Sequence, residues 1–172
     1  MDEKRAKEEY RSSIKALITE IAIVLAAVTI LFTFVFGIHI QKGQDMYPAL
    51  KDGDIVIYYR THKVSNTEAI VYEADNKKRT GRVVATEGSE IGSTGELQMI
   101  FDGNFLPISP GNGIYQRTYA REDEVLPVTV EKDCCFILGD NRDEAKDSRD
   151  YGQINQKDIK GRIITVIRKR MI

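Results

Sequence analysis

The longest apolar run of the chain lies near its N-terminus and predicts a membrane-spanning helix. No side chain from Ile21 to Ile38 is charged, and the run is interrupted only by Thr29, Thr33 and Gly37. A helix of these 18 residues would cover about 27 Å, which is close to the ~30 Å hydrocarbon thickness of a bilayer. The run is therefore long enough to cross a membrane.

Two other interpretations of this run fit the sequence less well. A buried core helix would have to be surrounded on all sides by a domain of only about 130 residues. A cleaved signal peptide would have a shorter apolar segment and a small-x-small cleavage site, whereas the run exits as Gly-Ile-His-Ile-Gln-Lys. We therefore expect a cytoplasmic arm at residues 1–17, a transmembrane anchor at residues 18–39 and an extracytoplasmic domain at residues 40–172.

Basic residues predict the orientation of the anchor. Five precede the span, at Lys4, Arg5, Lys7, Arg11 and Lys15, and Lys42 follows it closely. Because the cytoplasmic flanks of membrane helices are enriched in Lys and Arg, we expect the N-terminus to lie in the cytoplasm. The chain would then cross the cell membrane once.

Beyond the anchor, short β-branched and aromatic runs predict strands. These runs are Ile55–Tyr59, Ala69–Tyr72, Arg82–Ala85, Leu97–Phe101, Phe105–Leu106, Glu124–Val130, Cys134–Leu138 and Gly161–Ile167. Asp102-Gly103 is a hairpin signal, whereas Asp75–Thr80 and Ser109–Gly113 have the composition of loops. We expect a mostly antiparallel β-barrel or sandwich.

Composition excludes some classes of function. The chain has 172 residues, and its 25 basic and 26 acidic side chains give a net charge of -1, so no overall field favours nucleic acid. The two cysteines, Cys134 and Cys135, are adjacent and would point to opposite faces of a strand, which predicts neither a cross-linking disulfide nor a metal site. We interpret them as small apolar strand residues, with an intermolecular thiol reaction as the alternative. We expect no metal and no cofactor.

Three motifs follow the anchor in order. The first is Gly-Gln-Asp-Met-Tyr-Pro-Ala-Leu at residues 43–50, with Asp45 as its lone carboxylate. The second is Gly-Arg-Val-Val-Ala-Thr-Glu-Gly at residues 81–88. The third, residues 139–152, is a polar loop in which Asp147 and Arg149 have the spacing to pair. Taken alone, this loop could also be a solvated turn or a loose cation site.

Together the motifs resemble those of type I signal peptidases of the Gram-positive type, over nearly the whole chain. The resemblance implies a mostly β fold, an SH3-like β-barrel with a small cap, preceded by one N-terminal transmembrane α-helix. It also implies a membrane-anchored serine endopeptidase with a Ser/Lys dyad, which cuts signal peptides bound in an extended conformation.

The chain departs from the family pattern at three functional positions. Asp45 occupies the position of the nucleophilic serine, Gly81 that of the lysine, and Ala145 that of the serine that orients the lysine. The family reaction needs a hydroxyl nucleophile and a desolvated neutral amine. We therefore expect no catalytic residues.

Other catalytic groups were considered in their place. Attack by the Asp45 carboxylate on an amide favours reversal, and aspartic-peptidase chemistry would need Asp140 or Asp147 within about 3 Å of it. Lys77 would share a strand face with Gly81 but would lie about 13 Å away. An active signal peptidase with a non-standard catalytic group remains the alternative hypothesis.

The resemblance leaves the binding apparatus in place. The expected peptide-binding residues are Gly43, Asp45, Met46, Tyr47, Pro48, Arg82, Val83 and Val84, with Arg82–Ala85 offering an open strand edge to an extended peptide. Structural roles are implied for Asp140, Asn141, Asp147, Ser148 and Arg149. Asp45 either meets a cationic group of a bound partner or caps a neighbouring amide.

The resulting hypothesis is a non-catalytic signal-peptidase-like protein that binds an extended segment of a secreted surface protein at the outer membrane face. Family members without the dyad occur in gene clusters for surface assembly, notably of pili. The resemblance therefore implies pilin polypeptides as partners and also points to the sortase that links them. The sequence does not predict the oligomeric state.

Overall fold

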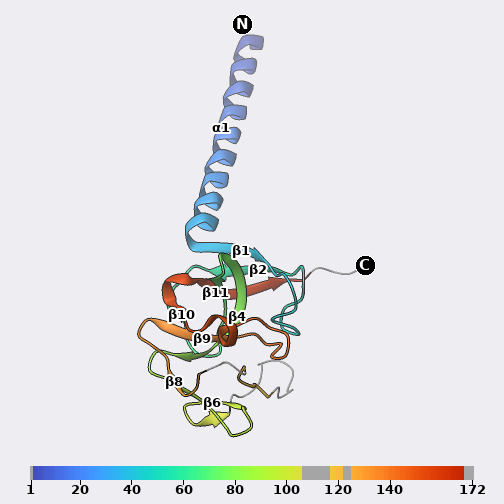
Figure 1. Ribbon diagram of the computed structural model, residues 1–172. Helices are drawn as coiled ribbons and strands as arrows, with labels where there is room; N and C mark the ends of the chain where they lie inside the picture. The colour runs from blue at the N-terminus through green and yellow to red at the C-terminus, as the bar shows by residue number, and fades with distance from the viewer. Residues whose placement is uncertain (1, 106–116, 122–124, 169–172) are drawn as a thin grey trace. The chain divides into compact units, whose positions relative to one another are not determined.

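The computed structural model describes residues 2–105, 117–121 and 125–168, and divides into two compact units, Met1–Phe36 and Gly37–Ile172 (Figure 1). Each unit is built from contacts within itself. The domain boundaries expected from the sequence, after residues 17 and 39, stay predictions.

The first unit is a long helix. Helix α1 spans Asp2–Ile30 and continues into a π-helical segment, η1, at Leu31–Val35. The stretch Tyr10–Val35 is long and apolar enough to cross a membrane, and none of its most apolar part is buried. Its apolar side chains therefore have no protein core to cover them, as expected for a single-pass anchor. The orientation of the anchor stays a prediction.

The helix ends earlier than the uncharged run. Backbone at Phe36 is extended, and strand β1 spans Phe36–Ile40. Gly37 fits this strand because a Cβ atom there would overlap the ring of Tyr58. The last residues of the apolar run therefore belong to a closely packed strand and not to the helix.

The second unit contains two sheets, and Figure 1 shows β1 and β2 at one end of it and β6 and β8 at the other. The seven-stranded sheet has the order β1-β2-β11-β3-β4-β9-β10. Its other strands are β2 (Ile55–Tyr59), β3 (Ala69–Ala74), β4 (Lys77–Thr86), β9 (Cys134–Leu138), β10 (Ile154–Asn155) and β11 (Ile159–Ile167). The short helices α2 (Ser148–Tyr151) and η2 (Gln156–Asp158) flank β10 in sequence.

The four-stranded sheet is an insertion between β4 and β9 with the order β7-β6-β5-β8. Its strands are β5 (Glu90–Ser93), β6 (Met99–Phe101), β7 (Asn104–Phe105) and β8 (Val128–Thr129). The predicted mostly β fold with one N-terminal apolar helix is confirmed, and this smaller sheet is the addition that the resemblance implied.

Most predicted strands are present, and the exceptions have local causes. Asp75–Thr80 was predicted as a loop, but β4 begins at Lys77, because Asp75 and Asn76 adopt positive φ and close a two-residue hairpin. Asp102-Gly103 closes the predicted hairpin in the same way. Strands β1, β5 and β10 were not predicted. Ser109–Gly113, Leu106 and Glu124, which fell in predicted elements, lie outside the described residues.

Three apolar clusters hold the domain together. One lies between the two sheets and contains Cys134, whereas Cys135 packs in a second cluster with Tyr72, Val83 and Ile137. The cysteines therefore point to opposite faces of β9, as predicted, and both are buried thiols. The third cluster forms around Met46 and supports the first motif.

Candidate functional site

The first motif forms a turn that is anchored to the core. Met46 and Leu50 are buried, whereas Tyr47 is 46% exposed. Gly43 adopts a φ of 79°, and its N–H donates to the Asp52 carboxylate at 2.8 Å. The amide of Gly43, an expected peptide-binding residue, is thus already paired with a side chain just beyond the motif.

Asp45 lies half-buried at the centre of this turn. Its carbonyl accepts the Asn141 N–H at 3.0 Å, which ties the first motif to the third. Its carboxylate accepts the backbone N–H of Lys146. Burial raises the pKa of this carboxyl, and the nearby Arg79 guanidinium opposes that rise. Asp45 therefore caps an amide, one of its two predicted roles, and contact with a bound cation stays a prediction.

The space for a lysine side chain at position 81 is filled. A Cβ atom on Gly81 would overlap Cγ2 of Ile137 and would lie 3.1 Å from Cε1 of Tyr72. Ile137 and Tyr72 are fully buried in the same apolar cluster. Side chains of the neighbouring strands β9 and β3 thus occupy the space at the position that the resemblance assigns to the family's lysine.

Ala145 lies against the first motif. A Cβ atom on Gly139 would overlap both the Cβ of Ala145 and the carbonyl oxygen of Asp45. Ala145 is fully buried. The structure therefore brings the serine position and the orienting position together beside Gly139.

Arg79 and two tyrosines adjoin this region, and the sequence prediction missed all three. Arg79 pairs with Tyr72 in the β3–β4 ladder, and its guanidinium carbon lies 4.8 Å from the centre of the Tyr151 ring. Burial raises the pKa of the Tyr72 phenol above its usual range, and the nearby Asp147 carboxylate adds to that effect. Strand alternation back from Gly81 would have identified Arg79 if β4 had been extended to Lys77.

The third motif is a buried polar network. The Asp147 carboxylate accepts hydrogen bonds from Nε–H of Arg149 at 2.9 Å and from the backbone N–H of Gly139 at 3.0 Å. The predicted pairing of Asp147 with Arg149 is therefore present, and both side chains are almost inaccessible. Ser148 Oγ accepts the Ile137 N–H at 2.9 Å. Asn141 holds the turn of Asp45, so these contacts fit the structural roles that the resemblance implied.

The predicted open edge at Arg82–Ala85 is wrong at Arg82 and Val83, which are bonded on both sides. Arg82 is opposite Ala69 of β3 and Leu138 of β9, and Val83 bonds Glu68 and Thr67 on one side while it pairs with Ile137 on the other. The Arg82 guanidinium also forms a two-pronged ion pair with Asp140, at 2.8 and 2.7 Å. Val83 and Val84 face apolar clusters. Peptide binding by these three residues stays untested.

The free edges lie elsewhere. Strand β9 pairs with β4 only from Arg82 onward, so Lys77–Gly81 has a strand partner on one side only among the described residues. Strand β1 stands at the end of its sheet, next to β2 alone. Gln41, just after β1, accepts the Thr80 hydroxyl at 2.5 Å and joins the two segments.

A hollow of about 550 Å³ opens between these segments, and we call it the β1–β4 cavity. Its lining consists of Ile38, His39, Ile40, Gln41, Lys42, Asp45, Lys77, Lys78, Arg79 and Thr80. The cavity thus connects the serine position with two strand edges that lack a second strand. An edge of this kind can take up an extended peptide through main-chain hydrogen bonds.

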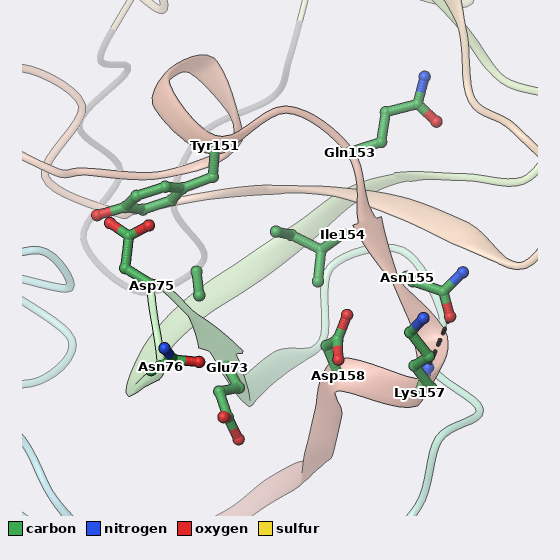
Figure 2. A pocket seen from close by; sticks show the side chains of 10 residues that line it. Glu73, Asp75, Asn76, Tyr151, Gln153, Ile154, Asn155, Lys157 and Asp158 are labelled. Carbon is green, nitrogen blue, oxygen red and sulfur yellow. Dashed lines mark hydrogen bonds between the residues drawn. The ribbon is translucent and has the colours of Figure 1, made fainter.

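A second hollow, of about 400 Å³, has Tyr151 in its lining (Figure 2). Glu73, Asp75 and Asp158 contribute carboxylates to its lining, and the Glu73 carboxylate pairs with Lys160 at 2.8 Å. Among the described residues no group of His, Cys, Asp or Glu has the arrangement of a metal site.

The filled position at Gly81 predicts energetic coupling with Ile137. We expect Gly81→Ala to lower the free energy of unfolding by about 1–3 kcal/mol through overpacking, and Ile137→Ala to lower it by about 2–5 kcal/mol. The double variant should lose at least about 1 kcal/mol less than the sum, because each change relieves the other. Urea unfolding of the full chain in micelles, followed by tyrosine fluorescence, measures this. Gly95→Ala, with no neighbour within 4 Å of its Cβ, is the control, and additive losses would contradict the packing.

The raised pKa of Asp45 predicts a pH effect on stability. The folded state binds the proton of the Asp45 carboxyl more tightly than the unfolded state does. The stability that this proton contributes is therefore lost as the pH rises from 3.8 through the folded-state pKa. As the pH rises across this window, the free energy of unfolding of Asp45→Asn should increase relative to that of the unchanged protein. Asp143→Asn, an exposed carboxylate of the neighbouring loop, is the control. A constant difference between Asp45→Asn and the unchanged protein at all pH values would refute the effect.

Comparison with known proteins agrees with this geometry. The family model described as "Signal peptidase, peptidase S26" matches residues 14–167. "Inactive signal peptidase IA" from Staphylococcus aureus (strain MRSA252) is 28% identical over 154 residues, which cover 83% of this chain and 86% of that protein. "Signal peptidase I P" from Bacillus subtilis subsp. natto is 30% identical over 179 residues, which cover 92% and 89%. The crystal structure of a signal peptidase I from Enterococcus faecalis V583 aligns at 20% identity and a TM-score of 0.43, over 60% of this chain and 97% of that one. The chain belongs to the signal peptidase family, peptidase S26.

Proposed function

We propose that this protein binds an extended segment of a secreted polypeptide at the outer face of the membrane and does not cut it. One observation carries the proposal. The nucleophile, base and orienting positions of the family hold Asp45, Gly81 and Ala145, and Ile137 fills the space of the base, while a cavity between two unpaired strand edges adjoins Asp45. Relatives named inactive signal peptidase support the same conclusion.

The remaining groups of the β1–β4 cavity are poorly suited to hydrolysis. The Thr80 hydroxyl donates to the side-chain oxygen of Gln41, an amide that cannot take up a proton. The amines of Lys77 and Lys78 are exposed, whereas a lysine that acts as a general base must be desolvated. These groups of the cavity can therefore support peptide binding without the proton transfer that cleavage needs.

The alternative is a peptidase that uses a non-standard catalytic group. Its specific support is that His39 and Thr80 line the same cavity, so that an imidazole and a hydroxyl lie in one hollow. An imidazole beside a hydroxyl is the usual means of activating an alcohol. The present partner of the Thr80 hydroxyl is Gln41, and for this reason we favour the non-catalytic function.

The proposed partner is a surface protein in the course of assembly. A single N-terminal anchor followed by a binding domain would keep the cavity near polypeptides that emerge from the membrane, provided that the domain lies outside the cell. Pilin subunits are the proposed cargo, and the sortase that joins them is a second candidate. The role in pilus biogenesis rests on the family resemblance.

Site-specific photocrosslinking in cells tests the proposed function. A photoreactive residue at Ile40, which is 54% exposed in the cavity lining, should capture a secreted surface protein in uncut form, whereas the same residue at Ile164, which is 48% exposed on β11, should not. Mass spectrometry of the captured chain gives the readout.

A second experiment distinguishes binding from cleavage. Purified full-length protein in micelles should leave a secretory precursor intact during prolonged incubation. Cleavage that is lost in His39→Ala or Thr80→Val would establish the alternative peptidase. Equal capture from Ile40 and Ile164 would refute a binding function for the cavity.

A further inference from the structure

The β1–β4 cavity carries an excess of positive charge. Lys42, Lys77, Lys78 and Arg79 contribute cations to its lining, and Asp45 is its one carboxylate. The pattern is local, because the chain as a whole has a net charge of -1. The bound segment must therefore enter a field that the rest of the protein does not share.

In the part of the chain that the structure describes, the positive charge of the cavity lining is not offset by ion pairs. Within the described residues, ion pairs engage Arg82, Arg121, Arg149, Lys160 and Arg162, but none engages a cation of the cavity lining. The five paired cations all lie outside the lining. A charge that is paired in the free protein is less available to a ligand. The cations of the cavity lining, which form no ion pair with a described residue, are therefore available to one.

Asp45 offsets only part of this charge, because it is one carboxylate beside four cations. Its carboxylate is half-buried and accepts the N–H of Lys146, and burial raises its pKa. The Arg79 guanidinium stacks on Tyr151, and its buried Nε has no hydrogen-bond partner within the described part of the chain. An N–H group that is buried without an acceptor costs free energy, which an incoming carboxylate would recover.

The strand geometry spreads the cations over both sides of the bound segment. Lys78 and Arg79 are neighbours on β4 and therefore point to opposite faces. Lys78 and Lys42 both act on His39 of β1, so these two cations lie on the β1 side. A segment that pairs with the edge of Lys77–Gly81 would present alternate side chains to Lys78 and to Arg79.

We propose that the segment held in the β1–β4 cavity is acidic, with carboxylate side chains that pair with Lys77, Lys78 and Arg79. This inference rests on the proposed function and adds the chemical class of the ligand. A peptide suits the cavity better than an anionic lipid headgroup, because the two unpaired strand edges offer main-chain donors and acceptors along a line. Lipid binding is an outcome of the test.

The experiment measures binding of three synthetic peptides to the full-length protein in zwitterionic micelles. The probes are fluorescein-labelled decapeptides in which Thr alternates with Glu, Gln or Lys, and fluorescence anisotropy gives the dissociation constants. The Glu peptide should bind at least about tenfold more tightly than the Gln peptide, and the difference should shrink with added salt. Lys77→Glu combined with Lys78→Glu should weaken its binding by about tenfold.

Two controls separate the charge from the cavity. Lys63→Glu combined with Lys132→Glu changes the net charge equally at exposed lysines outside the cavity lining and should leave binding unchanged. Ile40→Cys labelled with a bulky maleimide should block all peptide binding, whereas labelled Ile164→Cys should not. The native Cys134 and Cys135 are buried and should not react.

Each result has one meaning. Equal binding of the Glu and Gln peptides, blocked at Ile40, would overturn the acidic preference and leave the proposed function intact. Binding that is indifferent to the label at Ile40, or no peptide binding at all, would overturn both. Phosphatidylglycerol vesicles that displace the Glu peptide through the Lys77 and Lys78 charges, with a higher affinity than the peptide, would overturn the peptide in favour of a lipid headgroup.

Discussion

The site depends on one feature of strand pairing, the change of partner along β4. This strand pairs with β3 from Lys77 to Arg82 and with β9 from Arg82 to Thr86, so the two ladders overlap at Arg82 alone. Among the described residues, the edge of β4 that faces β9 further along is bare before that point, and after it β9 covers that edge. The bare edge borders the β1–β4 cavity, and the covered part contributes Val83, Val84 and Ala85 to the core. The Arg82–Asp140 ion pair lies at the junction and ties it to the third motif.

The same junction explains why position 81 has no room for a side chain. Gly81 is the last residue before the overlap, where β9 approaches closely enough for Ile137 to fill the space of a side chain. A lysine here would need room that the packed core no longer has. Asp45 is held in place from the opposite side, through Asn141 and Lys146. The third motif in turn is stabilised by the buried pair of Asp147 and Arg149, and loss of one partner from such a pair costs about 3–5 kcal/mol. Fold stability and the position of Asp45 beside the cavity therefore share their supporting contacts.

The sequence predicted the site in part. The positions of Asp45, Gly81 and Ala145 follow from motif order, and the ion pair of Asp147 with Arg149 from their spacing. The position of the open edge was wrong, because Asp75–Thr80 looks polar and loop-like while Asp75 and Asn76 alone make the turn. In the structure, Lys77–Arg79 belong to β4 and line the cavity. Pairing between distant strands decides which edge is bare, and no local pattern records it. The contacts of Tyr72 and Tyr151 with Arg79 depend on the same distant pairing.

Hydrogen–deuterium exchange of the full-length protein in micelles, with and without the alternating Thr-Glu peptide, tests the central claim most directly. A strand added to the bare edges would slow exchange of amides in Ile38–Ile40 and Lys77–Gly81. Amides of Arg82–Ala85 should not change, because their strand is already paired on β9 and partly on the β3 side. Mass spectrometry of the peptide after the experiment should find it uncut. Unchanged exchange at both edges in the presence of saturating peptide, or recovery of the peptide in cleaved form, would contradict the account.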